Sequence, residues 1–305
     1  MAEPSNIPPV DEFRLPGMDH ELYEFRALPD APRFDWPNEA RIALTVTVML
    51  DYWELQPPAD ARPDPRIVSP LGKFDPDWLT WSVREYGNRV GIFRVIDMLD
   101  RYGITPSVAI GTEAIKRYPE LVQAFRDREA CFMAHGTFAT RRITSAMDEM
   151  DEMILLAECA DALQRATGTN PAGWCGQDYT ESERTPEMLA QAGFTYTTDW
   201  SNDDRPYKMT SGLVSLPAHS EWSDLEAIHL RRVAPKVWAD GVAEAFAVLH
   251  DEGGGCFNLT LHPWVIGKPH HIRYLGDALS RILGRGKVWR TTTNAVASRV
   301  AGQLG

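Results

Sequence analysis

The sequence lacks the patterns that mark several common classes of protein. The four cysteines, Cys131, Cys159, Cys175 and Cys256, form no CxxC pair, so a zinc knuckle or a thioredoxin-type redox site is unsupported. Neither GxGxxG after the first apolar run nor GxxxxGK[ST] occurs, which argues against a nucleotide cofactor. GxSxG is also absent, so a serine nucleophile has no support.

The chain also lacks an excess of positive charge and any long apolar run. Its 31 basic and 43 acidic residues give a net charge of −12, so nucleic acid or an anionic membrane would be repelled overall. The N-terminal stretch MAEPSNIPPVDEF has no apolar secretion signal, and no apolar run approaches the ~20 residues that span a bilayer. These features predict a cytoplasmic protein with neither nucleic-acid nor membrane partners.

The chain does contain enough apolar material for a sizeable core, because 44% of its 305 residues are hydrophobic. Residues 1–38 hold many prolines and acids without periodicity, which predicts an extended N-terminal arm. Residues 39–305 are expected to form a single domain. Within it, the segment 54–80 carries many helix and strand breakers and predicts a long loop, a feature that is more often functional than accidental.

Apolar strands and amphipathic helices alternate after the arm. Residues 40–50, 104–111 and 130–136 are nearly continuous apolar runs, as expected for strands that are covered on both faces of a parallel sheet. Helical patterns at 90–103 and 145–168 each end at a glycine. The alternation predicts an α/β fold of about seven βα units, either an open wound sheet or a barrel.

Polar residues gather where the predicted strands end. Asp51 and Glu54 follow the first strand, His135 lies at the end of the third, and His262 lies near the end of a late strand at 256–264. In barrels and wound sheets, catalytic groups collect at the carboxyl ends of the parallel strands. We therefore predict one site at that end, and we place in it the polar or aromatic residues of two further segments, Gln177, Asp178, Asp199 and Trp200.

Each of these residues also has a structural explanation. Asp51 could cap a loop, and Asp178 and Asp199 could cap a helix or a turn. His135 could be a satisfied histidine of the core. The aromatic residues could serve packing alone. Their joint position at strand ends favours the functional interpretation.

Five stretches of the chain carry a family resemblance: RIALTVTVMLDYWE, WSVREYGNRVGIFRVIDMLDRYG, MAHGTFATR, GWCGQDYTESERTPEMLAQAGFTYTTDWSNDDRPY and LHPWVIGKPHHIRYL. They resemble the polysaccharide deacetylase (NodB-homology) superfamily, and most of all its branch of cofactor-free allantoinases and cyclic-imide hydrolases. The resemblance covers most of residues 40–300. It implies a distorted (β/α)7 barrel, hydrolysis of amide C–N bonds and assembly into a homo-oligomer.

The resemblance also implies roles for individual residues. Asp51 matches the metal-binding aspartate of metal-dependent members, and His135 matches the first histidine of their HxxxH pair. Ala139 stands in place of the second histidine, and Met49 stands in place of the usual general-base aspartate. His262 matches the histidine that serves as general acid.

A catalytic zinc usually has three protein ligands. Asp51 and His135 would be only two, so the resemblance implies either no cofactor or a weakly held divalent metal such as zinc. A substitute ligand would have to come from elsewhere in the chain, and the candidates are Glu54, Asp178, His270 and His271.

We interpret the chain as a hydrolase of a small amide, ureide or cyclic imide. Asp51, or alternatively Glu54, would activate water with help from His135, and His262 would protonate the leaving nitrogen. Tryptophans beside these groups could form flat walls for a ring-shaped substrate, namely Trp53, Trp174, Trp200 and Trp264. Two alternatives remain open at this point: a metal-dependent carbohydrate de-N-acetylase, and a non-catalytic small-molecule-binding protein on the same scaffold.

Overall fold

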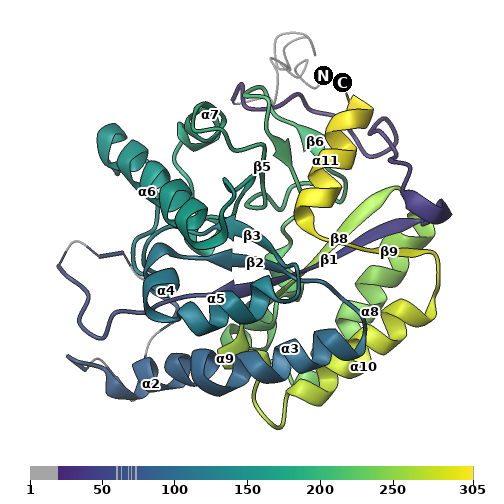
Figure 1. The fold of residues 1–305 in the computed structure, drawn as a ribbon. Coiled ribbons are helices and arrows are strands. Elements are labelled where there is room, and N and C mark those ends of the chain that lie inside the picture. Colours follow the sequence, from purple (N-terminus) through teal and green to yellow (C-terminus); the bar gives the residue numbers. More distant parts are fainter. Residues whose placement is uncertain are drawn as a thin grey trace, which may run out of the picture.

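The computed structural model describes residues 20–304, except residues 60, 63, 68, 70 and 73. The predicted arm therefore lies partly outside the described residues. Its described part passes β6 and α11 before it reaches β1 (Figure 1). Thr210 donates its backbone N–H to the carbonyl of Leu22 over 2.9 Å, and Arg205 donates to the carbonyl of Ala31 over 2.9 Å.

The described residues form one mixed sheet in the order β6-β7-β5-β4-β3-β2-β1-β8, with β9 also paired to β1. All its pairs are parallel except β6 with β7. The strands are β1 (Ile42–Leu50), β2 (Ser107–Ile110), β3 (Cys131–Ala134), β4 (Gly173–Trp174), β5 (Tyr196–Thr197), β6 (Tyr207–Lys208), β7 (Val214–Ser215), β8 (Gly255–Leu261) and β9 (Val288–Arg290).

Helices cover the outer face of this curved sheet, and α11 packs near β6 and β7 (Figure 1). The helices are α2 (Trp78–Tyr86), α3 (Ile92–Arg101), α4 (Thr112–Arg117), α5 (Pro119–Arg126), α6 (Glu149–Thr167), α7 (Thr185–Gln191), α8 (Pro235–Glu252), α9 (Pro263–Ile266), α10 (Ile272–Gly284) and α11 (Thr293–Leu304). The predicted α/β fold with a distorted barrel is confirmed. No helix of the described residues is long and apolar enough to cross a membrane.

Strand β1 pairs with three neighbours, β2, β8 and β9, and every one of its nine residues is buried. Its apolar side chains pack on both faces, as the uninterrupted run of hydrophobic residues predicts. The two threonines within it do not leave a polar group unpaired. Thr45 and Thr47 donate their hydroxyls to Asn258 Oδ1 of β8 over 3.0 and 2.8 Å, which satisfies the polar atoms inside the barrel.

The predicted helix at 90–103 begins earlier than its amphipathic pattern indicates. The chain runs without a break from α2 through a π-helical turn, η2 (Gly87–Gly91), into α3. Two glycines allow this turn to lie against α9. A Cβ atom on Gly87 would come within 2.7 Å of the Trp264 backbone nitrogen, and one on Gly91 within 2.1 Å of the Pro263 carbonyl oxygen. The glycines thus set the position of α9, which begins directly after His262.

Gly91→Ala is expected to lower the free energy of unfolding by about 1–3 kcal/mol, because the added methyl group overlaps backbone that has little room to move. Urea unfolding at equilibrium measures the change. Gly241→Ala in α8 is the matched control, since a Cβ there meets nothing within 4 Å. That variant should be unchanged or slightly more stable. Equal stability of the two variants would contradict the close packing of η2 on α9.

Candidate active site

A cavity of about 280 Å³ lies at the carboxyl ends of the parallel strands. Asp51 reaches it after β1, His135 after β3 and His262 after β8. The structure therefore brings together three side chains that lie far apart in the sequence. The cavity wall also contains five other residues that the sequence placed in the site, namely Trp53, Gln177, Asp178, Asp199 and Trp264.

Three residues expected at the site do not line this cavity. Glu54 lines a neighbouring cavity, where its carboxylate accepts a hydrogen bond from Thr140 over 2.5 Å and pairs with Arg141 over 2.9 Å. Trp200 is partly buried and donates its indole N–H to Glu181 over 3.1 Å.

Trp174 corrects an expectation. Its side chain is completely buried and packs edge-on against Phe194, so it forms no wall for a substrate. The reason is strand alternation, because neighbouring side chains of a strand point to opposite faces of the sheet. Trp174 belongs to the apolar cluster shared with the outer helices, whereas Cys175 belongs to the cluster inside the barrel.

Asp51, His135 and Gln177 form one hydrogen-bonded group. His135 Nε2 lies 3.2 Å from Asp51 Oδ1, and its Nδ1 lies 2.5 Å from the carbonyl oxygen of Cys175. Gln177 donates to Asp51 Oδ1 over 3.3 Å and to the His135 carbonyl over 2.5 Å. Both ring nitrogens of His135 thus face acceptors, and only the doubly protonated imidazolium donates from both.

The charges of this pair stabilise one another. Burial lowers the pKa of His135, but the charge of Asp51 and the hydrogen bonds to Asp51 and Cys175 outweigh it, so the pKa is held well above its ordinary value. Burial raises the pKa of Asp51, but the attraction of His135 outweighs it, and the pKa of the carboxyl is lowered. The pair is therefore a buried ion pair at neutral pH, and Asp51 is a weaker base than the sequence interpretation assumed.

His262 has a partner that the sequence did not reveal. Its Nδ1 donates to Asp224 Oδ1 over 2.8 Å, and Asp224 is fully buried. The same carboxylate accepts the backbone N–H groups of His262 over 2.9 Å and of Ile266 over 3.2 Å. It fixes both the ring and the start of α9. The His262 Nε2 atom then has no partner among the described residues and is available to a substrate.

Further carboxyl groups surround the cavity. Burial, with the charges of Asp64 and Asp51, raises the pKa of Asp178 to about 6. Asp199 Oδ1 accepts the backbone N–H of Gly176 over 2.7 Å. Burial raises the pKa of both Asp199 and its neighbour Glu181. The charge of Asp199 raises the pKa of Glu181 further, whereas the hydrogen bond with Glu181 lowers the pKa of Asp199. Glu181 therefore holds a proton more readily than Asp199 does.

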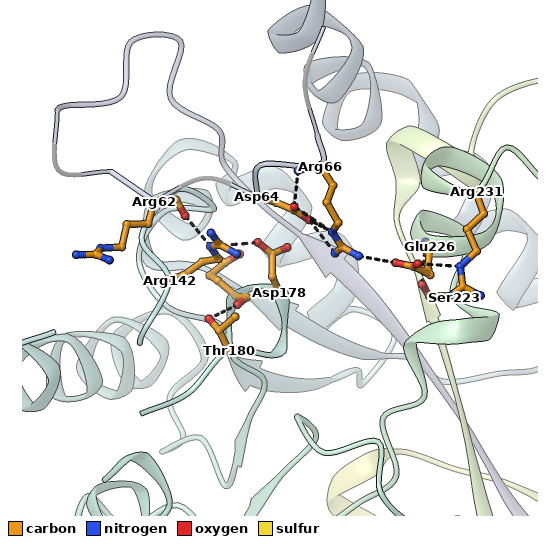
Figure 2. Close-up of polar contacts among 10 residues, drawn as sticks. Arg62, Asp64, Arg66, Arg142, Asp178, Thr180, Ser223, Glu226 and Arg231 are labelled. Atoms are coloured by element: carbon orange, nitrogen blue, oxygen red, sulfur yellow. Dashed lines mark hydrogen bonds and ion pairs between the residues drawn. The ribbon is translucent and has the colours of Figure 1, made fainter. Parts of the chain in front are cut away.

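An arginine of the cavity wall, Arg66, bridges two carboxylates (Figure 2). Arg66, from the long loop before α2, pairs with Asp64 over 2.9 Å and with Glu226 over 2.8 Å. Glu226 lies on η5 (Leu225–Leu230) and also pairs with Arg231 over 2.9 Å. Arg66 and Glu226 could not be found from sequence, because the two residues are 160 positions apart and neither follows a strand.

The described residues do not supply the ligand set of a catalytic zinc ion. They contain no group of three or more His, Cys, Asp or Glu side chains placed to hold a metal. Asp51 and His135 hydrogen-bond to each other, and Ala139 offers no donor. Of the four substitute ligands, Glu54 pairs with Arg141, and His270 and His271 line a different cavity. Asp178 lines the same cavity as Asp51 and His135, and its Oδ2 lies 3.7 Å from Arg142 Nε.

In Asp51→Asn the charge that keeps His135 protonated is removed. The wild-type imidazole should keep its proton to a pH well above the ordinary 6.5. In the variant only the contact with Cys175 still opposes burial, the largest effect, so the pKa should fall below that value. An NMR titration of the ring proton on Cε1 measures both. His229 is an internal control, because burial lowers its pKa to about 4 and this should persist in both proteins.

The same pair makes the stability of the fold depend on pH. A group with a raised folded pKa contributes fully below its unfolded pKa, and the contribution is lost as the pH rises through the folded pKa. The stability advantage of the wild type over Asp51→Asn should therefore shrink on the alkaline side of His135 titration. Identical titration of His135 in the two proteins would contradict the buried ion pair.

Comparison with known proteins was made in sequence and in structure. No family model matches the chain. A stretch of 135 residues, 43% of the chain, is 27% identical to the peptidoglycan deacetylase-like protein FGM2 of Gibberella zeae, and it spans 39% of that protein's length. A polysaccharide deacetylase homologue of Schizosaccharomyces pombe is 24% identical over 241 residues, which cover 71% of this chain and 74% of the relative.

The fold is also that of a solved enzyme structure. PuuE allantoinase superposes with a TM-score of 0.79 at 22% identity, and the superposition covers 89% of this chain and 94% of the allantoinase chain. The agreement in fold extends over nearly all of both chains. These likenesses confirm the resemblance to the polysaccharide deacetylase superfamily and the distorted barrel that it implied.

Proposed function

We propose that the chain hydrolyses a C–N bond of a small ureide, cyclic imide or related amide in the cavity between Asp51, His135 and His262. The observation that carries the proposal is the pairing of His262 with the buried Asp224, 2.8 Å apart, beside the Asp51–His135 ion pair in one cavity. The homologues of the chain are polysaccharide deacetylases and an allantoinase, which are C–N hydrolases.

In the proposed reaction His262 carries the proton. Because its Nδ1–H donates to Asp224, Nε2 can accept a proton from a water molecule while that water attacks the carbonyl carbon. The buried carboxylate of Asp224 stabilises the imidazolium that forms. Nε2 then delivers the proton to the leaving nitrogen as the C–N bond breaks. One imidazole thus serves first as base and then as acid, which replaces the base role first considered for Asp51.

The remaining polar groups would hold the substrate. The carboxylates of Asp51, Asp178 and Asp199 offer acceptors on the cavity wall, and ureides and cyclic imides present N–H groups to such acceptors. Trp53 and Trp264 supply flat apolar surface for a ring. The Arg66–Glu226 ion pair forms part of the wall of a cavity of about 280 Å³, a size that favours a small substrate over a polysaccharide chain.

A substrate screen tests this proposal directly. The protein is incubated with hydantoin, succinimide, allantoin and N-acetylglucosamine oligomers, each with chelator or with added zinc. We expect turnover of a ring amide or ureide that survives chelation, because the proton-carrying groups belong to the chain. Deacetylation of the oligomers only after zinc is added would instead establish a metal-dependent carbohydrate de-N-acetylase. Binding without turnover of any compound would establish a non-catalytic binding protein.

Asp224→Asn separates the proposed proton carrier from a structural role. Loss of the carboxylate charge should lower kcat by ~10²–10⁴-fold, because the protonated imidazole is no longer stabilised. The acidic limb of the pH–rate profile should also move to lower pH, which a purely structural defect would not produce. Asp277→Asn, at an exposed position of α10, is the matched control and should retain full activity. An unchanged kcat in Asp224→Asn would remove His262 from this role.

A further inference from the structure

A separate cavity contacts the wall of the candidate active site through the packing of His229 on Trp264. It measures about 330 Å³ and is lined by five basic or protonatable side chains, His229, Arg232, Lys268, His270 and His271. We call it the basic cavity. No aspartate or glutamate of the described residues lines it, although the chain as a whole carries a net charge of −12. At neutral pH His229 is uncharged, because its pKa is lowered to about 4, and the positive charge comes from Arg232 and Lys268. Two like charges without a carboxylate beside them point to an anionic ligand.

The two permanent cations of the basic cavity have no protein counterion. Neither Arg232 nor Lys268 forms a side-chain hydrogen bond or ion pair with another described residue. Burial lowers the pKa of Lys268, and the charge of Arg232 lowers it further. Burial lowers the pKa of His229 to about 4, and Arg232 and Lys268 add to the effect. The fold therefore holds these cations together at a cost that a bound anion would relieve.

His271 presents a buried donor or acceptor to the same cavity. The residue is only 8% exposed, and its Nδ1 lies 2.7 Å from the carbonyl oxygen of Val265. Because that bond uses Nδ1–H, Nε2 is left without a partner among the described residues. A bound anion would favour protonation of Nε2 and so gain a further hydrogen bond.

The amino end of a long helix completes the wall. Helix α8 has 18 residues, and its first residues, Ala234 and Pro235, line the cavity. Ala234 stands at the N-cap without a side chain that could cap the helix, so the first backbone N–H groups have no side-chain acceptor. Helix amino ends of this kind favour anions through these N–H groups and the helix dipole.

We propose that the basic cavity binds a small oxyanion of the phosphate type between Arg232, Lys268 and the amino end of α8. The volume of about 330 Å³ exceeds that of one inorganic phosphate, so the phosphate group of a small monoester also fits the proposal. Phosphate suits this site better than a carboxylate, because its several oxygens can meet a guanidinium, an ammonium and backbone N–H groups together.

The basic cavity is joined to the candidate active site by α9. The ring of His229 packs edge-on against Trp264, 4.7 Å between centroids, and Trp264 lines the active-site cavity. His271 donates a hydrogen bond to the carbonyl of Val265, which follows Trp264 in α9. A bound oxyanion would restrict the motion of His229 and His271, and through them that of α9, the helix directly after His262.

Isothermal titration calorimetry with inorganic phosphate and with ribose 5-phosphate tests the proposal, at constant ionic strength set with sodium chloride. We expect saturable binding of at least one of the two at a single site. Arg232→Gln and Lys268→Gln should each weaken it by about 10- to 100-fold, because each removes a hydrogen bond to a charged group. Lys208→Gln removes an equal charge at an exposed position of β6 and should bind as the wild type does.

The two ligands separate two sources of the same chemistry. Tighter binding of inorganic phosphate would identify free phosphate as the ligand, and tighter binding of ribose 5-phosphate would identify the phosphate group of a larger metabolite. Both results support the site. The proposal is overturned if neither compound binds saturably up to 20 mM, a limit on the order of ten times the millimolar affinities expected of weak sites, or if an Arg232→Gln/Lys268→Gln double variant binds as tightly as the wild type.

A second readout does not depend on catalysis. Hydrogen exchange of residues 262–272 should slow when phosphate is added to the wild type and should not slow in the double variant. The double variant should fold at least as stably as the wild type without phosphate, because neither side chain has a protein partner to lose. Since no substrate is present, failure of this test leaves the hydrolase proposal untouched.

Discussion

The register of the parallel strands is the constraint on which the rest of the molecule depends. Leu50 of β1 is paired with Ile110, Ile110 with Ala134, Ala134 with Trp174, and Trp174 with Thr197. The last residues of five strands therefore lie at one level, and the residues that follow them form one rim. A shift of a single position in any pair would turn side chains to the opposite face. The apolar character of these strands makes such a shift costly, because both faces are buried.

The register explains why a buried ion pair is tolerated at this rim. Asp51 and His135 each follow the last residue of a strand, and backbone pairing brings them within 3.2 Å without any flexible loop. Removing two charges from water is expensive, and their attraction compensates only when the geometry is good and the remaining polar atoms are satisfied. Gln177 and the Cys175 carbonyl provide those contacts. The geometry of the Asp51–His135 pair is therefore fixed by the sheet, and the pair does not stabilise the fold independently of it.

The sequence predicts those parts of the fold and the site that depend on local pattern. The long apolar runs of β1 and β8 predict these strands, and the polar residues directly after them, Asp51 and His262, can be predicted as site residues. The two-residue strands β4 and β5 are too short for their alternation to be read, which is why the direction of Trp174 was misjudged. Asp224 could not be predicted from the sequence, because it lies 38 positions from its partner His262 and follows no strand.

The helix α9 is the element through which these separate features act on one another. It has only four residues, so its own backbone hydrogen bonds stabilise it little, and its position is set from outside. Gly87 and Gly91 of η2 let it approach closely, and Asp224 accepts the backbone N–H of His262, directly before the helix, and that of Ile266, its last residue. The basic cavity supplies the third support through His229 and His271. These three supports fix the position of α9 and therefore of His262, whose Nε2 stays free. A ligand that changes one of the supports would move α9 and, with it, the imidazole of His262.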